Sequence, residues 1–339
     1  MGAFPCSRRQ VLGGMAATLF APALLSATRA SAAGGALSFP HAFGTTVLPE
    51  PPRRVVSIGY TTQDPLLALD IVPVGIREWF GDQPHGVWPW AQAHLKGADP
   101  AVIRGNVSLE AVAVLRPDLI VGIGSGINEA EYASLSRIAP VLMQPPEFPA
   151  YGMPWDAMTG LIGRAVGREA AADEKIREAA AILAAMRARH PGWSGRTGVA
   201  AYHYGGETGI FAPSDTRGHF LAQLGFEPVP AARHLDKTGA FYQKLSPEDL
   251  SALEADLIFW VSSTETAADL AQLPMRRALK AHAEGREVFA GGLLAAAISF
   301  GTILSLPFAA SELEADIAAA VDGDPATAVP SAVKAGLAP

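Results

Sequence analysis

The sequence predicts an α/β protein built from two Rossmann-like lobes with parallel-type sheets, joined by one long α-helix and separated by a ligand cleft. Three observations support this prediction. Short apolar strands alternate with helices along the 339 residues, one strand-and-helix unit occurs in both halves, and an alanine-rich stretch lies between the halves. Alternating strands and helices are typical of a parallel sheet that helices cover on both faces.

The first half supplies the strands and helices of one lobe. A proline-rich lead-in at 49–52 precedes them, and Pro65 suits the first turn of a helix. Short apolar runs bounded by turn residues predict strands, and apolar residues at helical spacing after a capping residue predict helices. The expected strands are 54–58, 72–76, 119–123 and 141–143, and the expected helices are 64–70 and 108–115.

The second half repeats part of the first. Residues 108–120 align without gaps on residues 246–258, and six of the thirteen positions are identical. Upstream, residues 66–74 resemble residues 221–229, after an expected strand at 197–204 in the second half. Two matched segments in the same order indicate an internal duplication.

Between the halves, residues from about 154 to 189 are compatible with one continuous helix. Residues 170–188 are rich in alanine, which favours a helix, and Pro191-Gly192 ends the stretch. Such a helix would rise about 50 Å and could cross from one lobe to the other, beside a cleft that suits a ligand. We therefore expect an N-terminal lobe at 33–150, a linking helix within 151–192, a C-terminal lobe at 193–325 and a tail at 326–339.

Residues 1–32 are typical of an export signal. Residues 7–12 resemble a twin-arginine box, with Arg8 and Arg9 before a mostly apolar stretch at 11–25. That stretch is shorter than the roughly 20 residues of a membrane span, and residues 30–32 (ASA) have the pattern of a cleavage site. We expect export by the twin-arginine route, giving a soluble periplasmic monomer; a short membrane anchor is the alternative.

The composition excludes some classes of partner and some kinds of chemistry. Lys and Arg number 26 against 33 Asp and Glu, and no basic tract is present, so nucleic acid is not an expected partner. The single cysteine, Cys6, lies before the apolar stretch, whereas a lipoprotein cysteine would follow it. The mature chain would therefore have no cysteine, and so no disulfide, thiolate nucleophile or cysteine metal site.

An ordered set of motifs resembles one known family. The motifs are 53–57 (RRVVS), 67–75 (LALDIVPVG), 109–112 (LEAV), 116–120 (RPDLI) and 132–140 (YASLSRIAP). The chain resembles the periplasmic substrate-binding proteins of ABC importers for ferric siderophores, haem and cobalamin, and residues 41–81 are most similar to the iron-siderophore branch. The resemblance implies a non-enzymatic receptor that delivers a ferric siderophore to an inner-membrane permease dimer. The siderophore, not a protein cofactor or metal site, would hold the iron.

The resemblance also implies a site with aromatic faces and a few cations, because siderophores are bulky, partly apolar and often anionic. Ligands of open α/β sheets bind beyond the carboxyl ends of the strands. The sequence does not distinguish hydroxamate, catecholate and carboxylate siderophores as the ligand. A highly charged tris-catecholate is disfavoured, because the acidic chain offers few candidate cations for the cleft. The residues that we expect to contact the ligand are Tyr60, Arg77, Trp79, Ser125, Tyr204, Arg217 and Tyr242; Trp88 and Trp90 are expected in the core.

Glu110 and Glu248 occupy equivalent positions of the repeat, each two residues into an expected short helix. An acidic residue in the first turn of a helix is favourable by up to about 1 kcal/mol without any further role. The resemblance implies another role, in which one glutamate per lobe pairs with arginines of the permease dimer. Duplication of one acid at symmetric sites suits such docking, so we interpret both as permease-docking residues.

Two other functions stay open. A haem or cobalamin receptor would share the fold, and an axial ligand at His203 or Tyr204 would favour it. A periplasmic α/β enzyme acting on a metal chelate is a different class, but residues 122–126 (GIGSG) match neither GxSxG nor GxGxxG and suit a glycine-rich turn. The eight histidines form no HxH, HxxxH or HExxH pair, so we expect no metal site in the protein itself.

Overall fold

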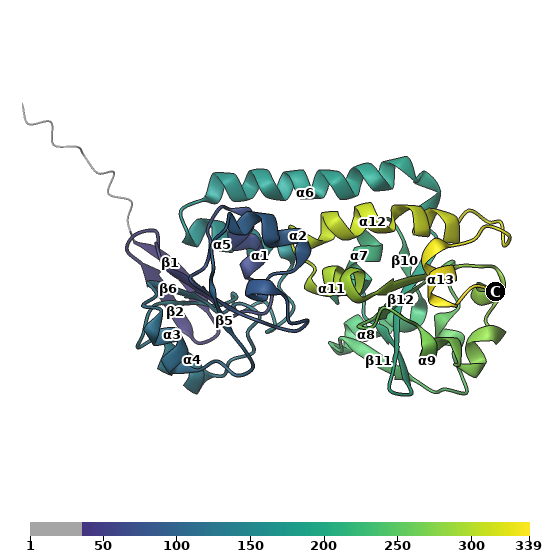
Figure 1. Ribbon diagram of the computed structural model, residues 1–339, viewed down its shortest axis with the longest axis horizontal. Coiled ribbons are helices and arrows are strands. Elements are labelled where there is room, and N and C mark those ends of the chain that lie inside the picture. The colour runs from purple at the N-terminus through teal and green to yellow at the C-terminus, as the bar shows by residue number, and fades with distance from the viewer. Residues whose placement is uncertain (1–35) are drawn as a thin grey trace, which may run out of the picture. The chain divides into compact units, whose positions relative to one another are not determined.

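In the computed structural model, which describes residues 36–339, the N-terminal lobe is built on a five-stranded parallel sheet of order β5-β4-β3-β6-β7 (Figure 1). The predicted strands at 54–58, 119–123 and 141–143 are confirmed, while the one expected at 72–76 begins only at Gly75. The strands are β3 (Val55–Ser57), β4 (Gly75–Arg77), β5 (Ala101–Ile103), β6 (Leu119–Val121) and β7 (Val141–Leu142).

Short helices and an antiparallel hairpin complete this lobe. The helices are α1 (Gln63–Ala68), α2 (Pro89–Gln92), α3 (Leu109–Val114) and α4 (Glu129–Leu135), and the hairpin pairs β1 (Leu37–His41) with β2 (Gly44–Leu48). The hydroxyl of Ser108 caps α3 by accepting a hydrogen bond from the backbone N–H of Ala111 at 3.2 Å. Asn128 and Glu131 form a capping box at the start of α4. Local capping residues therefore fix where these helices begin.

Within the described residues, the C-terminal lobe has a mixed six-stranded sheet of order β11-β9-β8-β12-β13, with β10 beside β8. β8, β10, β12 and β13 are mutually parallel where they pair, but β9 and β11 are antiparallel additions. Gly205 and Gly206 both have positive φ, at 59° and 79°, and their tight turn sends the chain back antiparallel after β8. The strands are β8 (Thr197–Tyr204), β9 (Glu207–Phe211), β10 (Glu227–Pro228), β11 (Tyr242–Leu245), β12 (Leu257–Ser262) and β13 (Glu287–Gly291).

Helices of the C-terminal lobe include the segment that the sequence predicts as a tail. They are α7 (Thr216–Gln223), α8 (Pro230–Thr238), α9 (Ala268–Ala271), α10 (Lys280–Ala283), α11 (Gly292–Phe300), α12 (Ser305–Ala320) and α13 (Pro330–Ala335). The hydroxyl of Ser331 in α13 accepts a hydrogen bond from the backbone N–H of Phe289 at 3.2 Å. The carbonyl of Leu337 accepts one from the Arg276 guanidinium at 3.1 Å. Residues 326–339 are therefore part of this lobe.

Two helices, not one, occupy the linking segment. α5 (Trp155–Ala165) ends before α6 (Glu169–Arg189) begins, so the prediction of one continuous helix from about 154 to 189 is wrong. Gly167 has φ of 68°, and its N–H and that of Arg168 donate to the carbonyls of Arg164 and Gly163 at 3.3 and 2.7 Å. This is the pattern of a Schellman motif, which ends a helix. α6 alone rises about 30 Å.

α6 contributes to the cores of both lobes. Ala172 near its start is buried among N-terminal lobe residues, whereas Leu183 and Met186 are buried in the C-terminal core. At its far end Arg189 pairs with Glu314 of α12 at 2.7 Å, and hydrogen bonds from Arg189 help to lower the pKa of Glu314 to about 2. α6 is therefore the long helix that connects the lobes (Figure 1).

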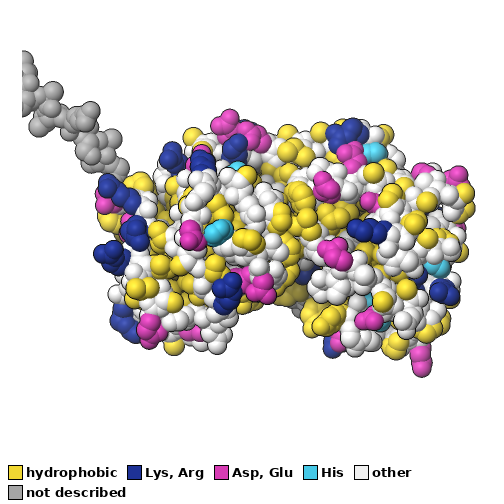
Figure 2. Space-filling model, in the orientation of Figure 1, with side chains coloured by type: hydrophobic (Ala, Val, Ile, Leu, Met, Phe, Trp, Pro, Cys, Tyr) yellow, Lys and Arg dark blue, Asp and Glu magenta, His cyan; other side chains and the backbone are white. Residues whose placement is uncertain are grey.

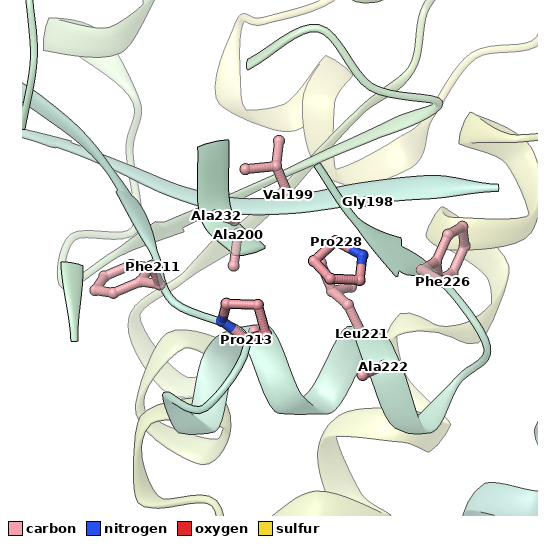
Figure 3. A pocket seen from close by; sticks show the side chains of 11 residues that line it. Gly198, Val199, Ala200, Phe211, Pro213, Leu221, Ala222, Phe226, Pro228 and Ala232 are labelled. Atoms are coloured by element: carbon pink, nitrogen blue, oxygen red, sulfur yellow. The ribbon is translucent and has the colours of Figure 1, made fainter. Parts of the chain in front are cut away.

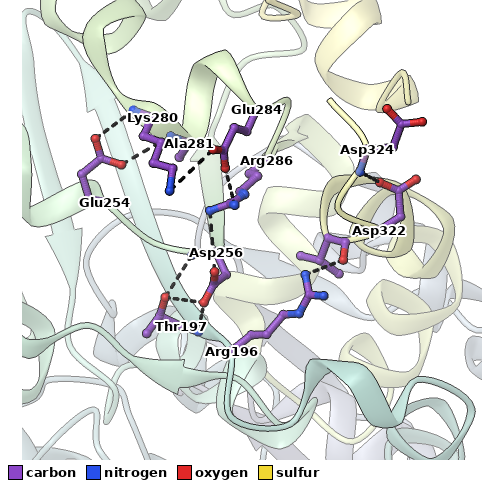
Figure 4. A network of polar contacts seen from close by, with 11 residues as sticks. Arg196, Thr197, Glu254, Asp256, Lys280, Ala281, Glu284, Arg286, Asp322 and Asp324 are labelled. Atoms are coloured by element: carbon purple, nitrogen blue, oxygen red, sulfur yellow. Dashed lines mark hydrogen bonds and ion pairs between the residues drawn. The ribbon is translucent and has the colours of Figure 1, made fainter. Parts of the chain in front are cut away.

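Each lobe fixes the start of its first sheet strand with an equivalent aspartate. The Asp118 carboxylate accepts hydrogen bonds from the backbone N–H groups of Arg53 and Arg54, both at 2.8 Å, before β3. The Asp256 carboxylate accepts from the backbone N–H and hydroxyl of Thr197, at 2.8 and 2.9 Å, at the start of β8 (Figure 4). The two aspartates align in the predicted repeat, so this shared contact supports the internal duplication.

Apolar packing fills the space between β8 and α7 (Figure 3). The side chains of Ala200, Leu221 and Pro213 meet there, with Phe211 and Phe226 on either side, around a gap of about 10 Å³, whereas the Val199 side chain points to the other face of β8. A gap of that size is at the lower limit of what one water molecule needs. It therefore belongs to the core of the lobe and is too small for a ligand.

The predicted export signal at 1–32, with Cys6, Arg8 and Arg9, lies outside the described residues. Between residues 36 and 339, none of the helices combines the length and the apolar character that crossing a membrane requires.

Candidate ligand-binding site

A cavity of about 580 Å³ lies between the two lobes. Its wall is formed by residues from the loops after β3, β4 and β6, from the start of α5, and from the C-terminal lobe around α7 and the end of α11. Hydrophobic side chains gather in the hollow between the lobes (Figure 2). The volume lies within the usual range of small-molecule sites. The predicted cleft is therefore present.

Aromatic rings from both lobes form one face of this cavity. Tyr60 and Trp79 follow β3 and β4, and their ring centres are 5.5 Å apart. Tyr151, from the loop before α5, stacks on Tyr60 with the ring centres 6.5 Å apart. Phe300, the last residue of α11, places its ring 5.5 Å from that of Trp79. Since Trp79 is 39% exposed, its ring is free to contact a ligand.

Arg77 and Ser125 lie behind this face. The Arg77 guanidinium stacks on the Tyr60 ring, with its carbon 4.3 Å from the ring centre, and donates to the Tyr60 hydroxyl at 2.9 Å. It also donates to the backbone carbonyls of Ser125 and Gly105, at 3.0 and 3.1 Å. Arg77 and Ser125 are both buried and neither lines the cavity. Arg77 therefore orients Tyr60 from behind.

Arg217, one of the residues expected to contact the ligand, lies at the start of α7 on the C-terminal lobe side of the cavity, where it is already paired. Its Nε and one terminal nitrogen donate to the two carboxylate oxygens of Asp215, at 2.6 and 2.7 Å. Its guanidinium carbon lies 4.0 Å from the centre of the Phe211 ring. The second terminal nitrogen is 3.5 Å from the hydroxyl of Ser299. A bidentate carboxylate contact is the strongest kind of arginine pairing, so this cation is largely neutralised.

Tyr204 and Tyr242 do not line this cavity, contrary to the prediction. Tyr204, at the end of β8, is 71% exposed and lines a separate hollow of about 120 Å³ together with His203. Tyr242, on the edge strand β11, is 51% exposed, and its ring centre is 6.0 Å from that of Tyr202. The Gly205-Gly206 turn carries the end of β8 away from the parallel part of the sheet. The two residues whose ligation would favour haem, His203 and Tyr204, are thus outside the cleft.

Trp88 and Trp90 pack as expected of core residues. Trp88 is buried, and the two indole rings are parallel with their centres 5.3 Å apart. Phe300 reaches them from the other lobe, at 6.2 and 5.3 Å between ring centres. These tryptophans therefore support the aromatic face without lining the cavity.

Several residues of the cavity wall do not follow sheet strands, so strand-end reasoning misses them. Tyr151 and Trp155 lie in and after a loop rich in proline and glycine, Phe300 ends a helix, and His219 lies in the middle of α7. In the glycine-rich turn, a side chain at Gly126 would collide with the Tyr151 hydroxyl, a contact that only the folded structure reveals. The glycine-rich turn therefore leaves room for the Tyr151 side chain beside the cavity.

Glu110 and Glu248 are both exposed, but their local structures differ. Glu110 lies in the first turn of α3, where hydrogen bonds from its own backbone N–H and from the Ser108 hydroxyl lower its pKa. Glu248 lies in a turn, so the prediction of a helix there is wrong. The Asp249 carboxylate accepts a hydrogen bond from the backbone N–H of Ser251 at 3.0 Å, and such local contacts compete with helix formation.

No group of three or more His, Cys, Asp or Glu side chains in residues 36–339 is placed to hold a metal ion.

The chain is similar in sequence or in structure to several substrate-binding proteins. Ferric dicitrate-binding periplasmic protein FecB of Escherichia coli (strain K12) is 33% identical over 145 residues, which cover 40% of this chain and about half (47%) of FecB. A periplasmic solute binding protein from Mycobacterium smegmatis has a similar crystal structure, with a TM-score of 0.75 and 36% identity over 85% of this chain and 99% of that chain. PiaA of Streptococcus pneumoniae TIGR4, crystallised in complex with ferrichrome, has a TM-score of 0.71 and 25% identity over the same shares.

The family assignment rests on the match to a family model, which covers more of this chain than the aligned region of FecB does. The model of the family described as periplasmic binding protein matches residues 55–292, from β3 in the first lobe to the start of α11 in the second. This match confirms the resemblance that the ordered motifs indicate, and the chain belongs to the periplasmic binding protein family.

Proposed function

We propose that the protein is a receptor that binds a ferric siderophore between its lobes and delivers it to an ABC importer for iron uptake. The observation that carries the proposal is the aromatic face of Tyr60, Trp79, Tyr151 and Phe300, drawn from both lobes around one cavity. A ligand that contacts both lobes can change the distance between them, and a permease could distinguish the loaded receptor by that distance. FecB is a ferric dicitrate-binding protein and PiaA was crystallised with ferrichrome, and these two iron chelates support this ligand class.

The site suits recognition of a finished chelate. Siderophores surround ferric iron with their own oxygen donors, so the protein needs to contact only the organic shell. Aromatic rings supply broad apolar contact, and the few polar groups of the wall set the orientation of the ligand. Iron is the cargo in this proposal, and the receptor carries out no chemistry on it.

Location and partners follow from the same proposal. The receptor would work in the periplasm as a monomer, after export by the twin-arginine route through residues 1–32. Glu110 and Glu248, one exposed acid on each lobe, would pair with arginines of a permease dimer. α3 also exposes Leu109 and Val114, at 37% and 75%, beside Glu110. Apolar side chains next to a charge are typical of a protein-docking surface.

Tryptophan fluorescence tests the proposal directly. The full chain is titrated with ferric siderophores, haemin, cobalamin and free metal ions, and saturable quenching by a ferric siderophore is expected. Trp79→Phe should reduce the quenching and weaken binding. Trp193→Phe is the matched control, because Trp193 is buried in the C-terminal core and stacks on His190, outside the cavity.

Each alternative has its own result in the same experiment. Quenching by haemin or cobalamin alone would indicate a receptor for that ligand and reject the siderophore. Recovery of an altered siderophore after incubation would indicate an enzyme. No saturable quenching by any probe would refute the ligand assignment.

A further inference from the structure

The charge of the cavity wall restricts the chemical class of the ligand; this inference rests on the proposed function. Among the described residues that line the cavity, the side chains with a full charge at neutral pH are those of Asp215 and Arg217. They have opposite signs and contact each other. The wall as a whole is therefore close to neutral.

Arg217 has little capacity left for an anionic ligand. Asp215 is only 8% exposed in its side chain and caps α7 by accepting a hydrogen bond from the backbone N–H of Arg217 at 3.0 Å. The carboxylate is thus fixed to the helix, and it holds the guanidinium through two further hydrogen bonds. A ligand carboxylate could reach the remaining terminal nitrogen, which is 3.5 Å from the Ser299 hydroxyl, but it could take the whole guanidinium only by leaving Asp215 buried without its cation, which is costly.

The second arginine near the site does not supply a free charge either. All three nitrogens of Arg77 donate to protein oxygens, those of Gly105, Ser125 and Tyr60. The Tyr60 ring covers its guanidinium, and Arg77 as a whole residue is 7% exposed. Only the Tyr60 hydroxyl connects it to the cavity, so the ligand meets a polarised phenol and not a guanidinium.

His219 adds no positive charge at neutral pH. Its ring opens on the cavity but is surrounded by protein atoms, and this partial burial lowers its pKa below the usual 6.5, although Asp156 acts in the opposite direction. The imidazole is therefore neutral there, with one nitrogen available as a donor and one as an acceptor.

We propose that the cavity selects a ferric chelate with no net charge, such as a trishydroxamate, and discriminates against multiply anionic ferric citrate and tris-catecholate complexes. Three hydroxamates each carry one negative charge and neutralise Fe³⁺, so the complex enters the cleft without unpaired charge. A multiply anionic complex would lose its hydration on entering a cavity of aromatic rings and one ion pair whose charges already offset each other, without an unpaired cation to replace the water. Trp79, Tyr60 and Phe300 suit the apolar shell of a neutral chelate.

The test compares three ferric complexes on the full chain by tryptophan fluorescence and calorimetry. The probes are ferrichrome, which is a neutral trishydroxamate, ferric citrate, and the tris-catecholate ferric enterobactin. Ferrichrome is expected to bind at least about 100-fold more tightly than either anionic complex. Tighter binding of an anionic complex would overturn this inference but leave the siderophore receptor standing. Failure of all three to bind would count against the proposed function itself.

A variant tests whether the ion pair causes the discrimination. Asp215→Asn keeps the capping oxygen of α7 but releases the charge of Arg217. The ratio of the ferric citrate affinity to the ferrichrome affinity is expected to rise at least about tenfold. Asp173→Asn, on the exposed side of α6, is the control and should leave the ratio unchanged. An unchanged ratio in Asp215→Asn would show that Arg217 does not set the selectivity.

Discussion

The carboxylate of Asp64 in α1 accepts a hydrogen bond from the hydroxyl of Thr302 at 2.5 Å, although the two residues are 238 positions apart and lie in different lobes. The indole N–H of Trp90 donates to the same oxygen at 2.8 Å. Thr302 directly follows Phe300 and Gly301, two residues of the cavity wall. The lobes thus meet beside the cleft through a buried acid whose other oxygen has no hydrogen-bond partner in the described structure.

The Asp64 contact predicts a pH dependence of stability. Burial raises the pKa of Asp64 to about 6 from the usual 3.8, against the effect of the hydrogen bonds from Thr302 and Trp90. As pH rises from about 4 to about 6, the folded protein keeps a proton that the unfolded chain has lost. This contribution to the free energy of unfolding is present below pH 4 and falls by roughly 3 kcal/mol across that window.

Asp64→Asn removes the titration but keeps an acceptor for Thr302 and Trp90. Urea unfolding of both proteins at about pH 4, 5, 6 and 7 should show the variant gaining stability relative to the wild type as the pH rises. Asp173→Asn is the control at an exposed site and should follow the wild type. A constant difference between wild type and Asp64→Asn at every pH would show that Asp64 does not titrate in this range.

The order of strands and helices could be predicted from the sequence because each short element carries local signals. Apolar runs predict β3, β6, β7 and β8, and Ser108 marks the start of α3. The break between α5 and α6 was not predicted, because residues 155–165 are compatible with a helix and the alanine-rich residues after the break favour one. Gly167 ends α5 through its positive φ, but Gly160 and Gly163 lie inside the same helix, so a glycine in the sequence does not by itself mark the break.

The site could be predicted only in part. Tyr60 and Trp79 follow parallel strands, whose carboxyl ends share one edge of the sheet, so strand positions alone bring them together. Phe300 enters from the other lobe, and no local pattern reports which residues meet across a cleft. The antiparallel turn after β8 removes Tyr204 from the cavity. The pairing of Arg217 with Asp215 could not be predicted either, because it depends on Asp215 capping the N-terminus of α7.

Permease docking predicts a separation of uptake from binding. Replacing Glu110 and Glu248 together by Ala should abolish uptake of the ferric ligand in cells, because one acid on each lobe would lose its arginine partner. Affinity for the ligand should stay within about twofold, since neither residue lines the cavity. Uptake of ⁵⁵Fe as the ferric siderophore and fluorescence titration measure the two quantities.

A matched control removes two exposed acids elsewhere. Asp173→Ala with Glu174→Ala on α6 changes the net charge equally and should keep uptake intact. Equal loss of uptake in both double variants would indicate a general effect of charge. Loss of ligand affinity in the Glu110 and Glu248 variant would instead place these residues in ligand binding.

A buried ion pair predicts a large loss of stability in the C-terminal lobe. Arg276 and Glu287 are 1% and 2% exposed, with 2.7 Å between nitrogen and oxygen, and Glu287 also accepts hydrogen bonds from Trp260 and His282. Arg276→Met leaves the carboxylate buried without its cation and should lower the free energy of unfolding by about 3–5 kcal/mol. Urea denaturation measures the difference.

The exposed pair of Arg233 and Glu227, also 2.7 Å apart, provides the comparison for that measurement. Its side chains are 50% and 57% exposed, so water screens the attraction and Arg233→Met should cost less than about 1 kcal/mol. Similar losses in Arg276→Met and Arg233→Met would contradict a special role for the buried pair.

The duplicated aspartates predict equal and independent effects on the two lobes. Asp118→Ala and Asp256→Ala each remove an acceptor that holds the first strand of a lobe, so each should lower the free energy of unfolding by about 1.5–3 kcal/mol. The corresponding Asn variants keep one acceptor oxygen and should recover part of the loss. Because the sites lie in separate lobes, the double Ala variant should show nearly the sum of the single effects in urea denaturation. A loss at one position with none at the other would show that the matched residues of the repeat no longer share a structural role.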